Sequence, residues 1–138
     1  MIAVVDIDGV LADAGHRQHL VESTPKDWAG FFAAVGQDAP IDAGVALVRE
    51  LAQEHDVVLL SGRPESTRDD TEAWLARHRI PHDRLVLRRD RDFRTAAVLK
   101  ADLIGGIGGP ADIVLVVDDD ASVVETLTRV GYRTLLFR

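Results

Sequence analysis

The chain has 138 residues, a net charge of −7 at pH 7 and no cysteine. This length fits a single domain over residues 1–138. The lack of cysteine excludes disulfides and cysteine-based zinc sites, and the negative charge argues against a protein that coats nucleic acid by bulk electrostatics. Because no long apolar stretch and no signal-like start is present, we expect a soluble cytoplasmic protein that does not associate with membranes.

Strands and helices are predicted in alternation along the chain. Short runs rich in Val, Ile and Leu are typical of strands buried in a parallel sheet, and they occupy residues 2–5, 57–60, 85–87, 113–117 and 134–137. Segments with helical apolar spacing lie between them, at residues 43–53, 67–78, 93–104 and 121–130. This alternation predicts the α/β class, with a three-layer, Rossmann-like fold around a five-stranded parallel sheet.

Two regions interrupt this alternation. Residues 11–40 contain Trp28 and Phe32 and predict a small helical insertion that packs over the mouth of the sheet as a lid. The alternative is a surface loop that Trp28 and Phe32 anchor to the core. Residues 105–110 imitate part of a dinucleotide-binding fingerprint, but they follow a helix and lead into a strand, so they indicate a flexible connection instead.

The first predicted strand ends in a pair of carboxylates, Asp6 and Asp8. A carboxylate that closes a buried parallel strand is unfavourable unless a partner compensates its charge. In an extended chain both side chains point to the same side, and two neighbouring carboxylates usually share a proton or bind a cation. One carboxylate could then attack a substrate while the other transfers protons.

The other predicted strands also end in polar groups, at the edge of the sheet where ligands of open α/β folds bind. Ser-Gly-Arg at 61–63 follows the second strand, and three aspartates at 118–120 follow the fourth. Residues 84–100 around the third strand carry six basic and two acidic residues, and they include Lys100. We expect these groups around one crevice, although the basic segment could also be a solvated charged loop.

These groups suit phosphoryl transfer. Asp6, with one or both of Asp118 and Asp119, could hold a Mg²⁺ ion through carboxylate oxygens. Ser61 and the backbone N–H groups after it, at a turn that opens the next helix, could donate to phosphate oxygens. Lys100 could compensate the charge on those oxygens in the transition state.

The order DxDG, SGR, a lysine and then DD resembles the haloacid dehalogenase-like superfamily of aspartate-nucleophile phosphotransferases. The resemblance implies that Asp6 is the nucleophile, which forms an aspartyl-phosphate, and that Asp8 is the general acid and base. It also implies that Ser61 binds the transferring phosphoryl group and that Lys100 stabilises it. The implied Mg²⁺ ligands are Asp6, the backbone carbonyl of Asp8, Asp118 and, as a further candidate, Asp119.

A narrower resemblance depends on the flanking residues. SGRPE at 61–65, the stretch from Arg88 to Lys100 and residues 16–28 of the insertion are similar to the phosphatase domain of polynucleotide kinase-phosphatases of phage and bacteria. Those enzymes remove 3′-phosphates from nucleic acid ends, which implies such an end as substrate and association with a kinase or ligase partner. No GxxxxGK[ST] loop of a kinase is present. The implied substrate-binding residues are Gly62, Arg63, Arg88, Arg89 and Arg94.

Several alternatives remain open. The substrate could be a small phosphorylated metabolite, such as a sugar phosphate or mononucleotide, or the chain could be a non-catalytic binding domain of the same fold. Ser61 could serve only as a helix cap, and Lys100 could be an exposed helix lysine, whereas Asp120 is expected to cap the last helix. The sequence does not determine the oligomeric state.

Overall fold

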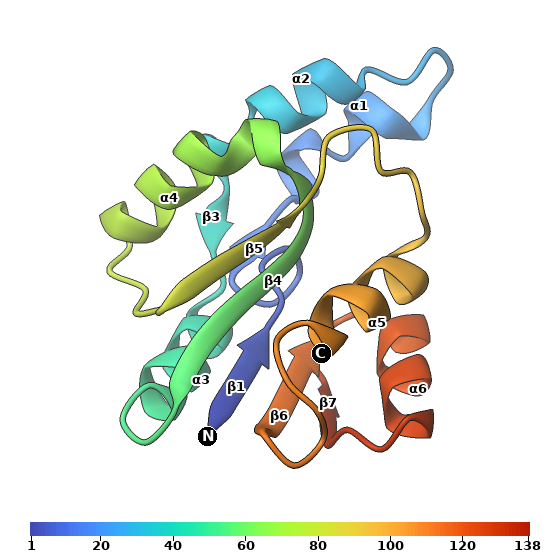
Figure 1. Cartoon of the computed structure of the whole chain (residues 1–138). Coiled ribbons are helices and arrows are strands. Elements are labelled where there is room, and N and C mark those ends of the chain that lie inside the picture. Colours follow the sequence, from blue (N-terminus) through green and yellow to red (C-terminus); the bar gives the residue numbers. More distant parts are fainter.

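The computed structural model describes residues 1–138 and contains a five-stranded parallel sheet in the order β5-β4-β1-β6-β7. Helices pack on both faces of this sheet (Figure 1), so the predicted fold class is confirmed. The strands are β1 (Ile2–Val5), β4 (Asp56–Pro64), β5 (Arg84–Arg88), β6 (Ile113–Asp118) and β7 (Thr134–Leu136).

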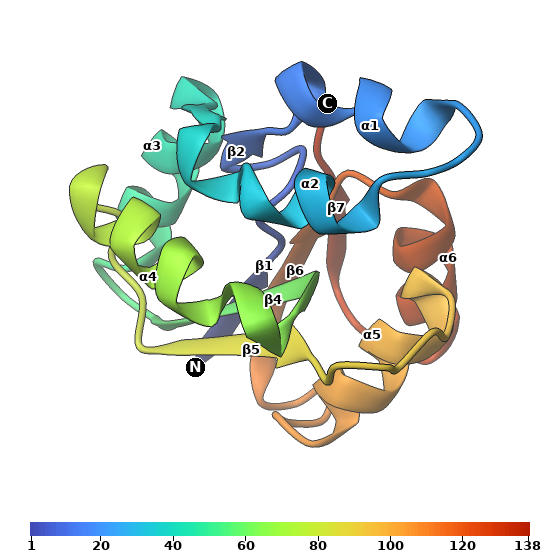
Figure 2. The ribbon, with the colours of Figure 1, turned by 90° about the horizontal axis from the view of Figure 1, so that it is seen from above.

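Side chains of the central strands alternate between the two faces of the sheet, as the pleat requires. Val5 packs with the helices α3 (Asp42–Leu51) and α4 (Arg68–Arg77), whereas Val4 packs on the side of α5 (Ala96–Gly105) and α6 (Ala121–Arg129). Figure 2 shows the resulting three layers from above. Both faces of the sheet are therefore covered, which explains the near-continuous apolar runs in the sequence.

The order in which strands are added to the sheet reverses at β1. β4 and β5 are added on one side of β1, and β6 and β7 are then added on the other side. Such a reversal leaves a crevice at the carboxyl ends of the strands next to it, here β1 and β6. Asp6 follows β1 directly and Asp118 is the last residue of β6, so the fold brings both carboxylates to this crevice.

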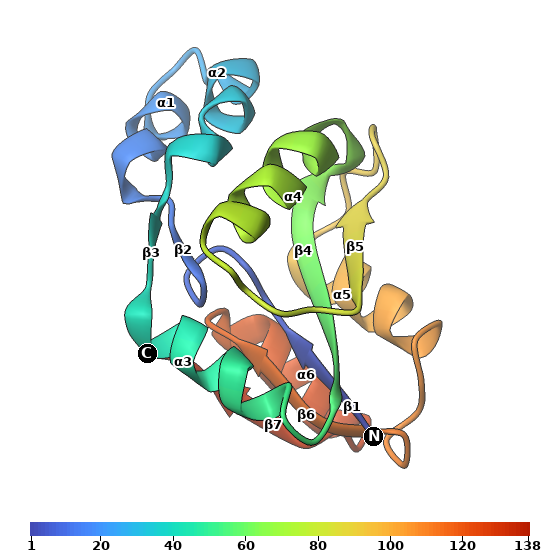
Figure 3. The same cartoon turned by 90° about the vertical axis from the view of Figure 1, so that its left-hand side faces the viewer.

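The insertion between β1 and α3 is helical, as predicted, and it lies beyond the carboxyl ends of the strands (Figures 1 and 3). A two-stranded antiparallel ladder closes its base and pairs Ala12 with Pro40. Trp28 is 49% exposed and Phe32 is not buried, so the alternative of a loop anchored by these two aromatics is wrong. The parts of the insertion are β2 (Ala12–Asp13), the 3-10 helix Gly15–Arg17, α1 (His19–Glu22), α2 (Trp28–Ala33), the 3-10 helix Val35–Gln37 and β3 (Ala39–Pro40).

One strand is longer than its apolar run. β4 continues through Ser61, Gly62 and Arg63 to Pro64, which pairs with Arg88 of β5 after a shift in register. The segment at 61–63 is therefore extended, and the expected turn opening the next helix lies further along, at the 3-10 helix Glu65–Thr67. Residues 106–112 connect α5 to β6, as predicted. None of the helices has the length and apolar character needed to cross a membrane.

Candidate active site

A buried lysine lies between two buried carboxylates where β1 and β6 end. The Nζ atom of Lys100, on α5, lies 3.0 Å from Oδ1 of Asp6 and 2.6 Å from Oδ2 of Asp118. Because Lys100 is only 4% exposed, its interpretation as an exposed helix lysine is wrong. Three residues from separate parts of the sequence thus form one ion-paired group.

Burial shifts the pKa of Asp6 and opposes the charge on Lys100. Burial raises the pKa of Asp6 well above its usual value, although the ammonium of Lys100 opposes this shift. Burial also disfavours the charge on Lys100, but the carboxylates of Asp6 and Asp118 outweigh that effect and raise the pKa of the ammonium. Lys100 therefore stays a cation, and ionisation of the buried Asp6 carboxyl is favoured by additional positive charge.

Asp119 completes a group of carboxylates that fits a hard divalent cation. One oxygen of each of Asp6, Asp118 and Asp119 lies within 4.8 Å of the other two. Burial raises the pKa of Asp119 as well, which again indicates a shortage of positive charge. Three carboxylates and the Lys100 ammonium leave a net charge of −2, which one divalent cation neutralises, and oxygen ligands are those that Mg²⁺ prefers.

A glycine next to this group permits its geometry. Gly9 has a φ of +83°, which is the left-handed region that favours glycine. A Cβ atom at this position would lie 1.8 Å from Oδ2 of Asp119. Any other residue at position 9 would therefore strain the backbone and displace Asp119.

Asp8 has different partners from Asp6. Arg63 donates to Asp8 from Nη2 at 2.8 Å and from Nε at 3.2 Å, and Nη2 of Arg17 donates to it at 2.9 Å. Both guanidinium groups are buried, whereas the Asp8 side chain is 34% exposed. The two carboxylates of the DxDG motif are therefore not hydrogen-bonded to each other, and each has its own cationic partner.

A buried aspartate of the insertion holds the two arginines together. Asp38 accepts hydrogen bonds from Nε of Arg17 at 2.8 Å and from Nη2 of Arg63 at 3.0 Å, and its backbone carbonyl accepts from the Trp74 indole at 2.7 Å. Nε2 of His16 also lies 2.6 Å from its Oδ1. The sequence does not identify Arg17 or Asp38 as site residues, because neither follows a predicted strand.

Ser61 lies within β4 and is buried, so its alternative interpretation as a helix cap is wrong. Its Oγ accepts a hydrogen bond from the backbone N–H of Arg63 at 3.0 Å. That N–H is therefore not free for a ligand, unlike the expectation for the backbone after Ser61. The hydroxyl hydrogen of Ser61 remains available to donate.

Two cavities share Asp8 as a lining residue. The first, of about 410 Å³, which we call the catalytic cavity, is lined by residues that include Asp6, Lys100 and Asp118. The second, of about 540 Å³, lies between the insertion and the β5–α5 loop, and we call it the aromatic cavity. Both are lined by Asp8 and Gly62. A substrate that spans both cavities would therefore pass Asp8.

A comparison with known protein families identifies the family of this chain. The family described as "Polynucleotide kinase PNKP phosphatase domain" matches residues 1–136. The chain belongs to this family. A comparison with curated protein sequences finds no match.

Several solved structures have a similar fold. A chain of the Pnkp1/Rnl/Hen1 complex superposes with a TM-score of 0.78 at 26% identity over 97% of this chain. A haloacid dehalogenase-like hydrolase from Streptococcus pneumoniae (TM-score 0.63, 12% identity, 96% of this chain and 82% of that one) shares the fold. So does a haloacid dehalogenase-family enzyme from Bacteroides thetaiotaomicron in complex with magnesium and inorganic phosphate (TM-score 0.58, 14% identity, 97% and 92%). The chain spans only 45% of the Pnkp1/Rnl/Hen1 chain.

In this domain of the PNKP phosphatase family, the arginines differ in how far their guanidinium groups already bond to other groups of the protein. Arg63 donates to Asp8, Asp38 and Thr71, and Arg88 donates to the carbonyls of Gly62, Asp92 and Arg94. Arg94 pairs with Asp92 and Asp102, and its hydrogen bonds to Asp92 lower the pKa of that carboxyl to about 2. Arg89 and Arg91 are exposed and have no side-chain partner in the chain.

The last aspartate of the DDD run has a structural partner. Oδ1 of Asp120 accepts from the backbone N–H of Ser122 at 2.9 Å, which caps α6 as predicted. The site thus offers a carboxylate near a lysine, an acidic cluster for a cation, a second carboxylate held by arginines and a buried hydroxyl. This arrangement can perform acid–base-assisted displacement at a phosphorus atom.

Proposed function

We propose that this chain is a Mg²⁺-dependent phosphomonoesterase that removes 3′-phosphates from nucleic acid ends through an aspartyl-phosphate on Asp6. The observation that carries the proposal is the ion-paired group of Asp6, Lys100 and Asp118 in a cavity that shares Asp8 and Gly62 with a second, arginine-bearing cavity. Membership of the PNKP phosphatase family supports it.

In the first step a carboxylate oxygen of Asp6 attacks phosphorus, and the bond from phosphorus to the 3′ oxygen breaks. Asp8 gives its proton to the departing 3′ oxygen. In the second step Asp8 takes a proton from a water molecule, whose oxygen attacks phosphorus and releases phosphate from Asp6. Lys100 offsets the charge on the phosphoryl oxygens, and the Ser61 hydroxyl donates to one of them.

A Mg²⁺ ion on Asp6, Asp118, Asp119 and the backbone carbonyl of Asp8 would neutralise phosphoryl and carboxylate charge. The acidic cluster and its deficit of positive charge support this ligand set. Arg17 and Arg63 hold the Asp8 carboxylate in place. We assign Arg63 this positioning role rather than the phosphate-binding role that the sequence suggested, because its donors are engaged within the protein.

The second candidate substrate is a small phosphorylated metabolite, which the net charge of −7 favours over a long polyanion. The arginine-bearing wall of the aromatic cavity favours the nucleic acid end instead. Because the similar chain belongs to a complex titled Pnkp1/Rnl/Hen1, we also propose that this chain acts beside a kinase or ligase partner, in the cytoplasm.

A substrate panel tests the proposal. With Mg²⁺, we expect a 3′-phosphorylated oligonucleotide to be hydrolysed faster than mononucleotides and sugar phosphates, and EDTA to abolish turnover. Asp6→Asn should abolish turnover without unfolding the chain, whereas Asp56→Asn, at the opposite end of the sheet, should not. Substantial hydrolysis by Asp6→Asn would exclude the aspartyl-phosphate, and preference for a sugar phosphate would favour the second candidate.

A further inference from the structure

The aromatic cavity is lined by aromatic side chains that are exposed or half-buried. Trp28, Phe31 and Phe32 of α2 all line it, and none of them is buried. On the other side, Phe93 of the β5–α5 loop is 89% exposed. Large apolar side chains that gather in a cavity and remain in contact with water mark a surface that a ligand covers.

The aromatic side chains on α2 are held in place without being buried. The Trp28 and Phe32 rings stack at a centroid distance of 5.8 Å with an interplanar angle of 23°. Phe31 packs edge-on against both and lies 4.3 Å from the guanidinium carbon of Arg17. Because Arg17 also binds Asp8, one buried guanidinium positions both the aromatic wall and the proton-transferring carboxylate.

The charge of this cavity limits the class of ligand. Arg89 and Arg91 line it and have no side-chain partner, so the ligand must combine a flat apolar group with negative charge. A nucleotide is such a ligand, since every base has a π-face that stacks on aromatic side chains and every internucleotide link carries a phosphate.

The position of the aromatic cavity indicates which nucleotide of the substrate it would hold. Asp8 and Gly62 line both cavities. In the proposed mechanism the leaving oxygen takes its proton from Asp8, so the nucleoside attached to that oxygen would lie next to the aromatic cavity. We propose that the aromatic cavity is a base-stacking subsite in which Trp28 and Phe93 hold the base of the terminal nucleotide that carries the phosphate. This inference rests on the proposed function and adds to it the recognition of the leaving group.

The subsite predicts that activity depends on the terminal base. Wild type should hydrolyse a 3′-phosphorylated oligonucleotide with a terminal base at least tenfold more efficiently than one with an abasic terminal residue, as base–aromatic stacking energies imply. Trp28→Ala and Phe93→Ala should each reduce this ratio severalfold. Val98→Ala, which removes another exposed apolar side chain but lines neither cavity, should leave the ratio unchanged. Equal turnover of the two substrates by wild type overturns the subsite.

A binding measurement separates this proposal from the proposed activity. The chain has two tryptophans, and Trp74 is fully buried, so Trp28 reports on the cavity. In the Asp6→Asn variant, the base-bearing oligonucleotide should quench tryptophan emission, whereas the abasic one should not, and Trp28→Phe should remove the effect. Quenching by the base without any wild-type turnover would support the subsite and reject the phosphatase. Turnover without base-dependent quenching would support the phosphatase and reject the subsite.

Discussion

Arg63 donates two hydrogen bonds to the carboxylate of Asp8, from Nη2 to Oδ1 at 2.8 Å and from Nε to Oδ2 at 3.2 Å. The planar guanidinium fixes both the position and the plane of this carboxylate. Because Arg63 lies in β4 and is 1% exposed, the sheet itself supports the group that transfers protons in the proposed mechanism.

Arg63→Lys should impair the proton donation by Asp8 more than the attack by Asp6. A lysine keeps the charge but cannot form the two parallel hydrogen bonds, so Asp8 loses its orientation. We expect kcat for a 3′-phosphorylated oligonucleotide to fall about 100-fold, the cost typical of a misplaced catalytic group. Acetyl phosphate, whose leaving group needs no proton, should be affected much less.

Arg49→Lys is the matched control, because Arg49 donates to backbone carbonyls on the surface, away from both cavities. It should leave both activities close to wild type. Equal losses on the two substrates in Arg63→Lys would mean that Arg63 supports the site in general and not Asp8 in particular.

Lys100→Met should destabilise the fold in a way that Mg²⁺ repairs. The change leaves Asp6 and Asp118 buried without their cation, and loss of one partner of a buried pair costs about 3–5 kcal/mol. A bound divalent cation supplies the missing charge, so Mg²⁺ should raise the free energy of unfolding of the variant more than that of wild type. Urea denaturation with and without Mg²⁺ measures both quantities.

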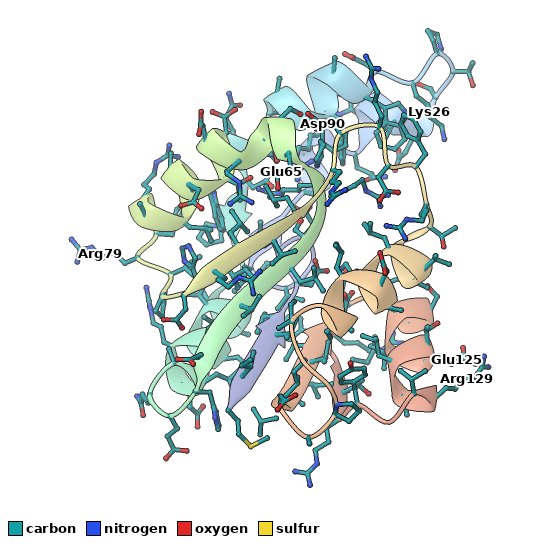
Figure 4. All side chains as sticks on the ribbon, viewed as in Figure 1. Lys26, Glu65, Arg79, Asp90, Glu125 and Arg129 are labelled. Carbon is teal, nitrogen blue, oxygen red and sulfur yellow. The ribbon has the colours of Figure 1, made fainter.

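The other lysine of the chain, Lys26, provides the control. It lies in the exposed turn of the insertion, far from α6 with its outward-pointing Glu125 and Arg129 (Figure 4), and forms no salt bridge. Lys26→Met should change the free energy of unfolding by less than about 0.5 kcal/mol. A similar Mg²⁺ response in both lysine variants would contradict the assignment of the cation site.

The residues at the ends of the strands could be predicted from the sequence, because a polar residue directly after the apolar run of a parallel strand lies at the carboxyl edge of the sheet. The ends of the predicted strands place Asp6 and Asp118 at one edge of the sheet, with Lys100 on the helix after the third strand, and the structure has all three there. Arg17 and Asp38 could not be predicted from the sequence, since their burial depends on how the insertion folds back on α4. The predicted turn at Ser61 also failed, because pairing with β5 extends β4 beyond its apolar run.

Mg²⁺ binding should release a proton over part of the pH range. Burial raises the pKa of Asp6, with Lys100 opposing, and a cation binds the carboxylate rather than the acid. Below that raised pKa, the apparent affinity for Mg²⁺ should therefore rise about tenfold per pH unit, and it should level off above it. Calorimetric titrations in two buffers with different ionisation enthalpies count the protons released.

The raised pKa of Asp6 should also make the free energy of unfolding depend on pH in the absence of metal. The native state holds the Asp6 proton more tightly than the unfolded chain does, so this contribution is present at low pH. It is lost as the pH rises from the unfolded pKa to the raised folded one. Asp6→Asn should remove this part of the pH dependence, and an unchanged profile in that variant would assign the dependence to other groups.

Arg89 and Arg91 should determine how strongly salt inhibits the reaction with an oligonucleotide. Both are exposed, line the aromatic cavity and lack protein partners, so their charges are available to phosphodiester groups. Each phosphate contact with a single strand contributes about 0.7 to the slope of log affinity against log salt. Arg89→Gln and Arg91→Gln should therefore each lower that slope by about this amount.

Two further arginines serve as controls. Arg94→Gln should change the slope less, because Asp92 and Asp102 already hold the Arg94 guanidinium. Arg133→Gln, outside both cavities, should not change it. A slope that none of these changes alters would place the nucleic acid elsewhere on the surface.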